Sequence, residues 1–337
     1  CRRKNTVIMS NTQHSWKYNK WFVLGFIYLF ISVLLALFHG HLINVGRRFD
    51  EGLRTALHYQ IITQDDALPW TYRILIPYTA QGLNDFILSL TPGHISLERE
   101  RVNIENCYLL IRGITFCATF IGFHKLLEHW LKPTWALMGT LFFALLHGPT
   151  FIFYWFQPSS PLDLCLWIWT AHFTLSKRYG YLFPIIVVGT LNRETAVFII
   201  LIHFVLQWKK EPFLKTCIRC AFLSCLWASI FFGLRWLIPA DNAAHAKKWS
   251  EFLNHNLTNY HWLQYTFVFL SSWAILPWLH WKKIPREIKG LILVMIPYIL
   301  LIFLFGRIRE VRLFLPLCIP LIPATMLYIR DSIEKTS

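Results

Sequence analysis

Residues 21–38 read WFVLGFIYLFISVLLALF, an apolar run without a charged residue. In a helix that rises about 1.5 Å per residue, this run approaches the roughly 30 Å thickness of the hydrocarbon core of a bilayer. Lys17 and Lys20 precede it, and basic residues are enriched on the cytoplasmic side of membrane helices, so we expect this helix to begin in the cytoplasm. Because the run is long for a signal peptide and no clear cleavage site follows it, we predict a permanent membrane span.

The composition of the whole chain agrees with a membrane protein. Of its 337 residues, 55% are hydrophobic and only 15% are charged, whereas a soluble domain carries about 25% charged residues. The net charge of +15 comes from short basic clusters between apolar blocks, and no basic face persists over a longer stretch. We therefore expect membrane lipid as a partner and exclude nucleic acid.

Further apolar blocks of membrane length follow. Residues 181–208 would form a helix of about 42 Å, which is too long for one span. The tetrapeptide Asn192-Arg193-Glu194-Thr195 interrupts this block, so we predict two shorter helices that meet there. The sequence thus predicts an all-α, polytopic membrane helical bundle with about ten membrane segments. The other predicted spans are 104–123, 134–154, 160–176, 216–238, 262–280, 290–305 and 313–329.

The longest polar stretch follows the first span. Within it, Arg73–Leu90 mixes apolar with polar residues and contains Pro77, which is typical of an amphipathic helix lying on the membrane surface. In a rival layout this segment spans the membrane, but the basic residues Lys125 and Lys132 would then lie outside, and we disfavour it. We predict a single membrane domain, 1–337, that consists of a cytoplasmic head (1–20), an outer loop with a juxtamembrane helix at about 73–90 (39–103) and a helical bundle (104–329).

Lysine and arginine separate between the two predicted sides of the membrane. The segments expected in the cytoplasm, which include both chain ends, hold 13 lysines and 6 arginines, whereas the outer segments hold 12 arginines and 2 lysines. Arginine binds phosphate and carboxylate through a planar fork of donors, and lysine offers a point charge. The outer arginines therefore favour either an anionic ligand or anchoring to lipid phosphates, and the split alone does not choose between them. We expect the protein in a bacterial inner membrane.

Charged residues at membrane depth cost at least about 2.5 kcal/mol on insertion scales and usually line a cavity or a site. Such residues form four patches, all on the predicted outer side. For each patch a structural role also stays open: ion pairs in a solvated loop, a salt bridge, a helix cap or headgroup anchoring. The patches are Asp50, Glu51, Asp65 and Asp66, with Arg73 shortly after them; Asp163; Arg193 and Glu194; and Arg307, Arg309, Glu310 and Arg312.

Other polar residues in or beside the apolar blocks favour structural interpretations. Arg112 and Arg235 are expected to snorkel toward the membrane surface. His58 and His147 show no metal-ligand spacing, so structural or interfacial roles are expected for them. Residues 256–258 read NLT, which matches the short pattern of an N-glycosylation acceptor on the predicted outer side.

The layout resembles the C-type glycosyltransferases, multi-pass enzymes that use lipid-phosphate-linked sugars. Members carry an acidic residue in the first outer loop soon after the first span, and a surface helix follows that loop. Phe49-Asp50-Glu51 and the stretch Trp70–Pro77 are similar to this arrangement. The stretches 189–196, GTLNRETA, and 309–316, REVRLFLP, are similar to segments of bacterial membrane proteins of this general type. The sequence does not choose which outer carboxylate corresponds to the acidic residue of the family.

The resemblance implies transfer of a sugar from a polyprenyl-phosphate donor to an acceptor at the non-cytoplasmic face. Asp50 or Asp66, with Asp65 and Glu51 as further candidates, would deprotonate the acceptor hydroxyl. Arg193 and the arginines of 307–312 would hold the phosphate leaving group by charge-assisted hydrogen bonds. No ligand pattern requires a cofactor, although outer carboxylates are compatible with a divalent metal.

Two other functions stay open. A transporter or flippase of an anionic lipid or sugar would also need embedded arginines, but many transporters have matched broken helices in two halves, and only one broken hairpin is predicted here. An integral membrane acyltransferase would need a catalytic histidine near the membrane face, for which His41 is available.

Overall fold

The computed structural model describes residues 3–46, 53–63, 72–91, 96–151, 159–238, 249–259, 263–308 and 310–336. Within these ranges the regular elements are all helices, so the predicted all-α fold is confirmed. The principal helices are α1 (Arg3–Gly46), α2 (Leu53–Thr63), α3 (Leu75–Ser89), α4 (Leu97–Leu127), α5 (Pro133–Leu145), α6 (His147–Thr150), α7 (Ser159–Leu175), α8 (Leu182–Asn192), α9 (Val197–Gln207), α10 (Phe213–Leu237), α11 (Trp249–Thr258), α12 (Leu263–Leu270), α13 (Leu276–Leu279), α14 (Arg286–Phe305) and α15 (Cys318–Thr336).

Five helices are long and apolar enough to cross a membrane, which is consistent with a membrane protein. They include the first apolar run and four of the spans predicted further along the chain. In chain order they are Lys20–Leu42 in α1, Arg99–Leu127 in α4, Phe213–Leu237 as α10, Arg286–Phe305 as α14, and Val311–Lys335, which joins the 3-10 helix η9 (Val311–Leu317) to α15.

Two apolar blocks are interrupted. As predicted, 181–208 forms two helices, α8 and α9, which are separated by Arg193 and the short 3-10 helix η4 (Glu194–Ala196). The segment predicted as a span at 262–280 is not one continuous helix, because it divides into α12, a 3-10 turn and α13. Ser271 has a φ of 30°, and Pro277 lacks the backbone N–H that a continuous helix would need, so the helical hydrogen bonds stop between α12 and α13.

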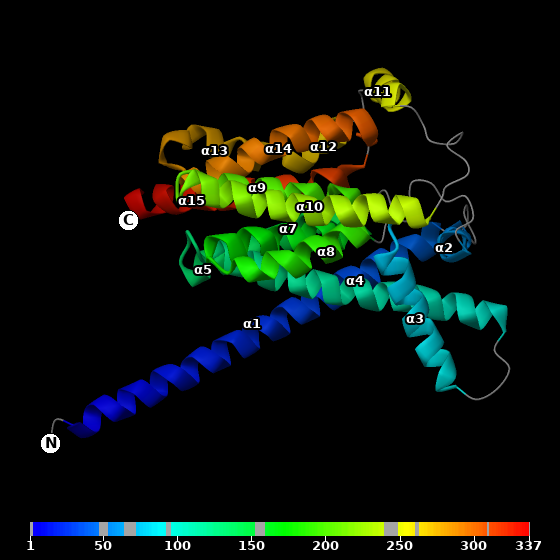
Figure 1. The fold of residues 1–337 in the computed structure, drawn as a ribbon. Coiled ribbons are helices and arrows are strands. Elements are labelled where there is room, and N and C mark those ends of the chain that lie inside the picture. Colours follow the sequence, from blue (N-terminus) through cyan, green and yellow to red (C-terminus); the bar gives the residue numbers. More distant parts are fainter. Residues whose placement is uncertain are drawn as a thin grey trace.

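Most of the helices lie side by side along one direction (Figure 1). In sequence order, α4 packs against α1 and α7, α7 against α8 and α9, and α14 against α9 and α15. Helix α3 occupies the position predicted for the juxtamembrane helix, packs against α4 and crosses the direction of the bundle (Figure 1). Its buried residues, among them Ile76 and Ala80, form a small separate cluster with Ile104 and Cys107 of α4.

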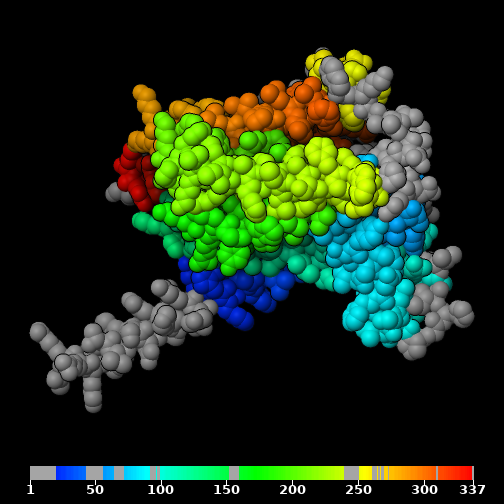
Figure 2. Space-filling view, viewed as in Figure 1, coloured from blue at the N-terminus to red at the C-terminus, as the bar shows by residue number. Residues whose placement is uncertain are grey.

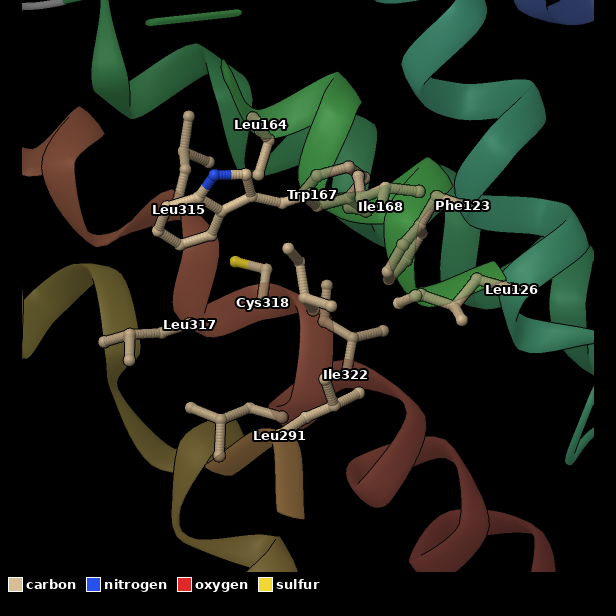
Figure 3. Close-up of a cluster of buried hydrophobic side chains, with 14 of the residues drawn as sticks. Phe123, Leu126, Leu164, Trp167, Ile168, Leu291, Leu315, Leu317, Cys318 and Ile322 are labelled. Carbon is tan, nitrogen blue, oxygen red and sulfur yellow. The ribbon is translucent and has the colours of Figure 1, made fainter. Parts of the chain in front are cut away.

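The hydrophobic core lies between α4, α7, α14 and α15 (Figure 3). Trp167 and Ile168 of α7 face Cys318 and Ile322 of α15, and all four are fully buried. Facing helices approach closely at Gly290 of α14, where an added Cβ would lie only 2.5 Å from the side chain of Val205 in α9.

The outer surface of the bundle is apolar as well. Helix α10 lies at the front of the space-filling view (Figure 2) and exposes large apolar side chains along its length. Phe222 is 60% exposed and Trp236 is 83% exposed, which water would penalise and lipid would not. The sequence pattern of uncharged blocks thus corresponds to helices that are apolar both toward the core and away from it.

The two ends of the bundle differ in their charged residues. At one end, which we call the lysine end, lysines form ion pairs with glutamates: Lys20–Glu128 at 4.0 Å, Lys132–Glu334 at 3.7 Å and Lys210–Glu287 at 2.6 Å. At the opposite end, the arginine end, the ion pairs within the described ranges all use arginine: Arg73–Glu194, Arg193–Asp163 and Arg312–Glu310. The chain begins and ends on the side of the lysine end (Figure 1).

Candidate functional site

The break between α8 and α9 places polar groups at the arginine end. The helical hydrogen bonds of α8 end where Arg193 turns into extended backbone, with φ −165° and ψ 146°. The Asn192 side chain donates to the backbone oxygen of Ser159, at 2.9 Å, and thereby fixes the break against the start of α7. The Arg193 side chain, which is 13% exposed, also points toward α7, and Nη1 donates to Ser160 Oγ at 3.4 Å.

Asp163 connects α7 to this break. The hydroxyl of Thr195 donates to Asp163 Oδ2 at 2.6 Å, and Arg193 Nη1 lies 4.0 Å from the same oxygen. Asp163 is only 4% exposed, so its carboxylate needs these two groups to offset its lost hydration. The aspartate and the arginine, which lie in different sequence patches, therefore belong to one buried cluster.

Arg73 ties the start of α3 to the same break. Its guanidinium forms two hydrogen bonds with the Glu194 carboxylate, one of them from Nε to Oε2 at 3.2 Å. The Arg73 side chain is 9% exposed and that of Glu194 is 39% exposed, so the pair closes the cluster toward the surface. Next to it, the Arg235 guanidinium lies over the Tyr72 ring, 4.5 Å from its centroid.

A cavity of about 50 Å³ lies inward of these ion pairs. It lies where α1, α4, α6, α7, α14, η9 and the break after α8 converge. Its lining contains three arginines, Arg112, Arg193 and Arg312, and one carboxylate, Asp163. The polar lining is completed by His39, Thr119, His147, Thr150, Ser160 and Tyr298, and the apolar lining by Phe116, Phe151, Pro161, Leu164, Leu313, Leu315 and Pro316.

Arg112 carries the least compensated charge of the cavity. It is 9% exposed, and it forms no ion pair with any residue in the described part of the chain. Another arginine, Arg312, lines the same cavity. Snorkelling toward the membrane surface was expected for Arg112, whereas the structure shows its side chain nearly buried and lining the cavity.

Several buried polar atoms around the cavity lack a hydrogen-bond partner among the residues that the structure describes. They are His39 Nδ1, His147 Nε2, Asp163 Oδ1 and Arg193 Nε. Buried polar groups in folded proteins are almost always paired, with protein, water or ligand. A water or another polar molecule in the cavity would satisfy these four atoms, and the arginines would favour an anion there.

The segment before α15 completes the arginine end. Arg312 Nη2 donates to Glu310 Oε2 at 2.8 Å, and the Tyr298 hydroxyl of α14 donates to the backbone oxygen of Leu313 at 2.9 Å. Arg307 does not line the cavity. Asn256 of α11 braces this segment, because its amide donates to the backbone oxygens of Phe303 and Gly306, both at 2.9 Å, and accepts from the Ile308 N–H.

The structure brings together four of the residues that the sequence singled out, Arg73, Asp163, Arg193 and Glu194, and places Glu310 and Arg312 beside them. Asp50, Glu51, Asp65, Asp66 and Arg309 lie outside the described residues. Sequence reasoning missed His39, Tyr298 and the roles of Arg112 and His147. Their one shared signal is a polar side chain inside an apolar block, which by itself does not distinguish a buried cavity from a lipid interface.

Within the described ranges, no three His, Cys, Asp or Glu side chains come close enough to hold a metal ion. Comparison with protein-family models, with curated proteins and with solved structures finds no match to this chain.

Proposed function

We propose that this protein is an integral membrane glycosyltransferase that moves a sugar from a polyprenyl-phosphate donor to a hydroxyl acceptor. In this proposal about ten membrane segments form the bundle, because the shorter helices α5, α7, α8 and α9 and the interrupted pair α12–α13 join the five long ones. The lysine end, with both chain ends, lies in the cytoplasm of a bacterial cell, and the arginine end lies on the outer face of the inner membrane.

The observation that supports this proposal best is the excess of arginine around the cavity. Arg112, Arg193 and Arg312 line it, and Asp163 is the one carboxylate among the described residues of its lining. Moving a charge out of water costs on the order of several kcal/mol unless a partner of opposite charge compensates for the lost hydration. A bound phosphate would supply the missing negative charge, and a lipid-linked sugar phosphate would bring it to this membrane-embedded end of the bundle.

The proposed reaction is a single displacement at the anomeric carbon. An outer carboxylate takes the proton of the acceptor hydroxyl; the candidates are Asp50 or Asp66, with Glu51 and Asp65 as neighbouring alternatives. The acceptor oxygen then attacks the anomeric carbon as the bond from this carbon to the phosphate oxygen breaks. Negative charge then develops on the leaving phosphate, where Arg112 and Arg193 would stabilise it. Displacement from the opposite face predicts inversion at the anomeric carbon.

An integral membrane acyltransferase is the second candidate, and one observation favours it. His147, and not the His41 expected from the sequence, lines the cavity, and its Nε2 has no hydrogen-bond partner among the described residues, which suits a general base for acyl transfer. A transporter or flippase receives less support, because the cavity lies at one end of the bundle whereas transporter sites lie near the middle of the membrane.

Purified protein in detergent tests the proposal with a polyprenyl-phosphate sugar and a panel of hydroxyl acceptors. We expect transfer by the unmodified chain. The transfer rate should fall roughly 100-fold in Arg193→Ala, which weakens the hold on the phosphate, and in the one of Asp50→Asn and Asp66→Asn that removes the base. Arg219→Ala is the matched control, because Arg219 pairs with Glu211 at 2.8 Å at the lysine end. The mechanism would be abandoned if all three variants kept full transfer.

A further inference from the structure

The cavity contains hydrogen-bond acceptors as well as cationic donors. A site that needs only to hold an anion requires donors alone, since a fully ionised oxyanion offers nothing but acceptors. Two of the lining residues nevertheless carry a buried acceptor atom, Asp163 Oδ1 and His147 Nε2, without a hydrogen-bond partner in the described part of the chain. Their presence constrains which anion fits.

The hydrogen bonds of His147 establish that its Nε2 is an acceptor. Its Nδ1 lies 2.9 Å from the backbone oxygen of Phe143, and because a carbonyl oxygen only accepts, Nδ1 carries the hydrogen. The rings of Phe116, Phe120 and Phe143 pack edge-on against the imidazole, with centroids 5.3, 5.4 and 4.7 Å away. This apolar surrounding and the neighbouring arginines favour the neutral ring, whose Nε2 then has a free lone pair.

Asp163 offers the second acceptor. Its Oδ2 is occupied by the Thr195 hydroxyl and faces Arg193, whereas Oδ1 is buried and unpartnered among the described residues. Burial opposes the charged carboxylate, and Arg193 at 4.0 Å and the Thr195 hydroxyl at 2.6 Å stabilise it; in its charged form Asp163 accepts hydrogen bonds and donates none. A guest of this cavity must therefore accept from arginine and donate to Asp163 or His147 at the same time.

We infer that the cavity selects a phosphate that still carries a P–O–H group, as inorganic phosphate and the monoanion of a phosphomonoester do, over sulfate and over phosphodiesters. Arg112, Arg193 and Arg312 supply donors for the charged oxygens, and Asp163 or His147 accepts the remaining hydrogen. The volume of about 50 Å³ exceeds the roughly 10–15 Å³ that one water needs, so the cavity has room for a small anion.

This inference extends the proposed function, and the part of it that concerns a lipid-linked phosphate rests on that function. In the proposed transfer the carrier enters as a phosphodiester and leaves as a phosphomonoester. The proton of the acceptor hydroxyl goes to the outer carboxylate and from there to water, and the released phosphomonoester takes up one proton from water to become its monoanion, so the reaction balances. A cavity that prefers a P–O–H group would hold this released carrier more tightly than the phosphodiester donor.

Titration calorimetry of the full chain in detergent, at pH 6.5 and constant ionic strength, tests the preference without any transfer assay. The probes are inorganic phosphate, sulfate, dimethyl phosphate and geranyl phosphate. We expect phosphate to bind at least about tenfold more tightly than sulfate and dimethyl phosphate, because the last two leave a charged acceptor unpaired. Tighter binding of geranyl phosphate than of inorganic phosphate identifies a lipid headgroup as the ligand, and the reverse identifies free phosphate.

Two variants assign the preference to the named acceptors. His147→Phe keeps the aromatic surrounding filled, and we expect it to lower phosphate affinity toward that of sulfate while sulfate affinity stays the same. Asp163→Asn replaces an acceptor by a donor, so it should shift the preference toward sulfate even if His147→Phe fails to fold. The matched control is His203→Phe, since His203 is also fully buried but bonds Thr174 near the lysine end.

Equal affinities for phosphate and sulfate in the unmodified protein, or no binding of either anion, would overturn the inference. Failure of the glycosyltransferase proposal gives a different result, because a chain without transfer activity can still prefer phosphate to sulfate. Conversely, full transfer activity together with equal affinity for phosphate and sulfate would support the glycosyltransferase proposal and contradict the inference that the cavity selects a P–O–H group.

Discussion

The charged residues Asp163 and Arg193, which meet at the arginine end, come from two separate apolar blocks of the chain. Arg193 and Glu194 stand out because they interrupt a long apolar block, and Asp163 because it begins another. Their convergence is a tertiary property, since Asp163 meets Thr195 only when α7 packs against α8 and α9. His147 lies in an apolar block with no spacing signal, so that its role as an acceptor depends on Phe143 and on the neighbouring rings, which the sequence alone does not place.

A buried histidine away from the cavity gives a pH dependence with a defined sign. His58 of α2 is fully buried between Tyr108 and Gln81, at 2.8 Å from each, and burial lowers the pKa of its imidazole below 6.5. Below about pH 6.5 the His58 imidazole therefore binds a proton more readily in the unfolded chain than in the folded chain. Stability is complete above about pH 6.5 and falls as the pH drops below that value toward the lowered folded pKa. The melting temperature of the purified protein should thus decrease between pH 7.5 and pH 5.

His58→Gln separates this contribution from all others. Glutamine can accept from Tyr108 and donate to Gln81 but does not titrate, so its melting temperature should change less over the same pH interval. An equal slope in the variant and the unmodified chain would show that other groups control the acid sensitivity.

At the scale of the elements, breaks and contacts were predictable to different degrees. The division of 181–208 was predicted because charged residues inside an apolar block require compensation. The division of 262–280 was missed, since its interrupting residues, Ser271 and Pro277, are uncharged and one proline is tolerated in many membrane helices. Contacts between helices, such as that of α14 with α9, were hardly predictable, because their only signal in the sequence is a glycine within an apolar run.

The close approach of α14 and α9 makes a specific substitution costly. In Gly290→Ala the new Cβ would lie 2.5 Å from the Val205 side chain, and overpacking of this kind costs about 1–3 kcal/mol. We expect a lower melting temperature that Val205→Ala restores in the double variant. Gly233→Ala in α10 is the control, because nothing lies within 4 Å of its added Cβ. A wild-type melting temperature for Gly290→Ala would contradict the close packing of these helices.

For the whole molecule, the separation of lysine from arginine is the most informative feature. The sequence pattern predicted two sides, and the structure places the corresponding ion pairs at opposite ends of one bundle. Hydropathy explains the helices. Among the described residues lysine pairs occur at the lysine end alone, whereas arginine pairs occur at both ends, with Arg219–Glu211 and Arg330–Asp331 at the lysine end. The number of membrane segments beyond the five long helices was not predictable from length alone, because α7, α8 and α9 are shorter than a typical span.

Reporter fusions check the orientation that we propose. Alkaline phosphatase needs export for its disulfides, so it should be active when fused after Ile238, which follows α10 toward the arginine end, and inactive after Gln207 at the lysine end. A fluorescent protein on the C-terminus should fluoresce, as it does in the cytoplasm. The opposite pattern would place the arginine end in the cytoplasm and exclude an outer-face reaction.

The hydrogen bonds of Asn256 determine when during synthesis this side chain can be modified. This asparagine is the acceptor of the NLT pattern, yet its side chain is 1% exposed and bonded to the end of α14. An enzyme that attaches sugars to asparagine cannot reach it once α11 has docked. In a eukaryotic expression host, a glycan on Asn256 would therefore mark those copies that were modified before docking, so the glycosylated fraction records the order in which synthesis, modification and folding took place.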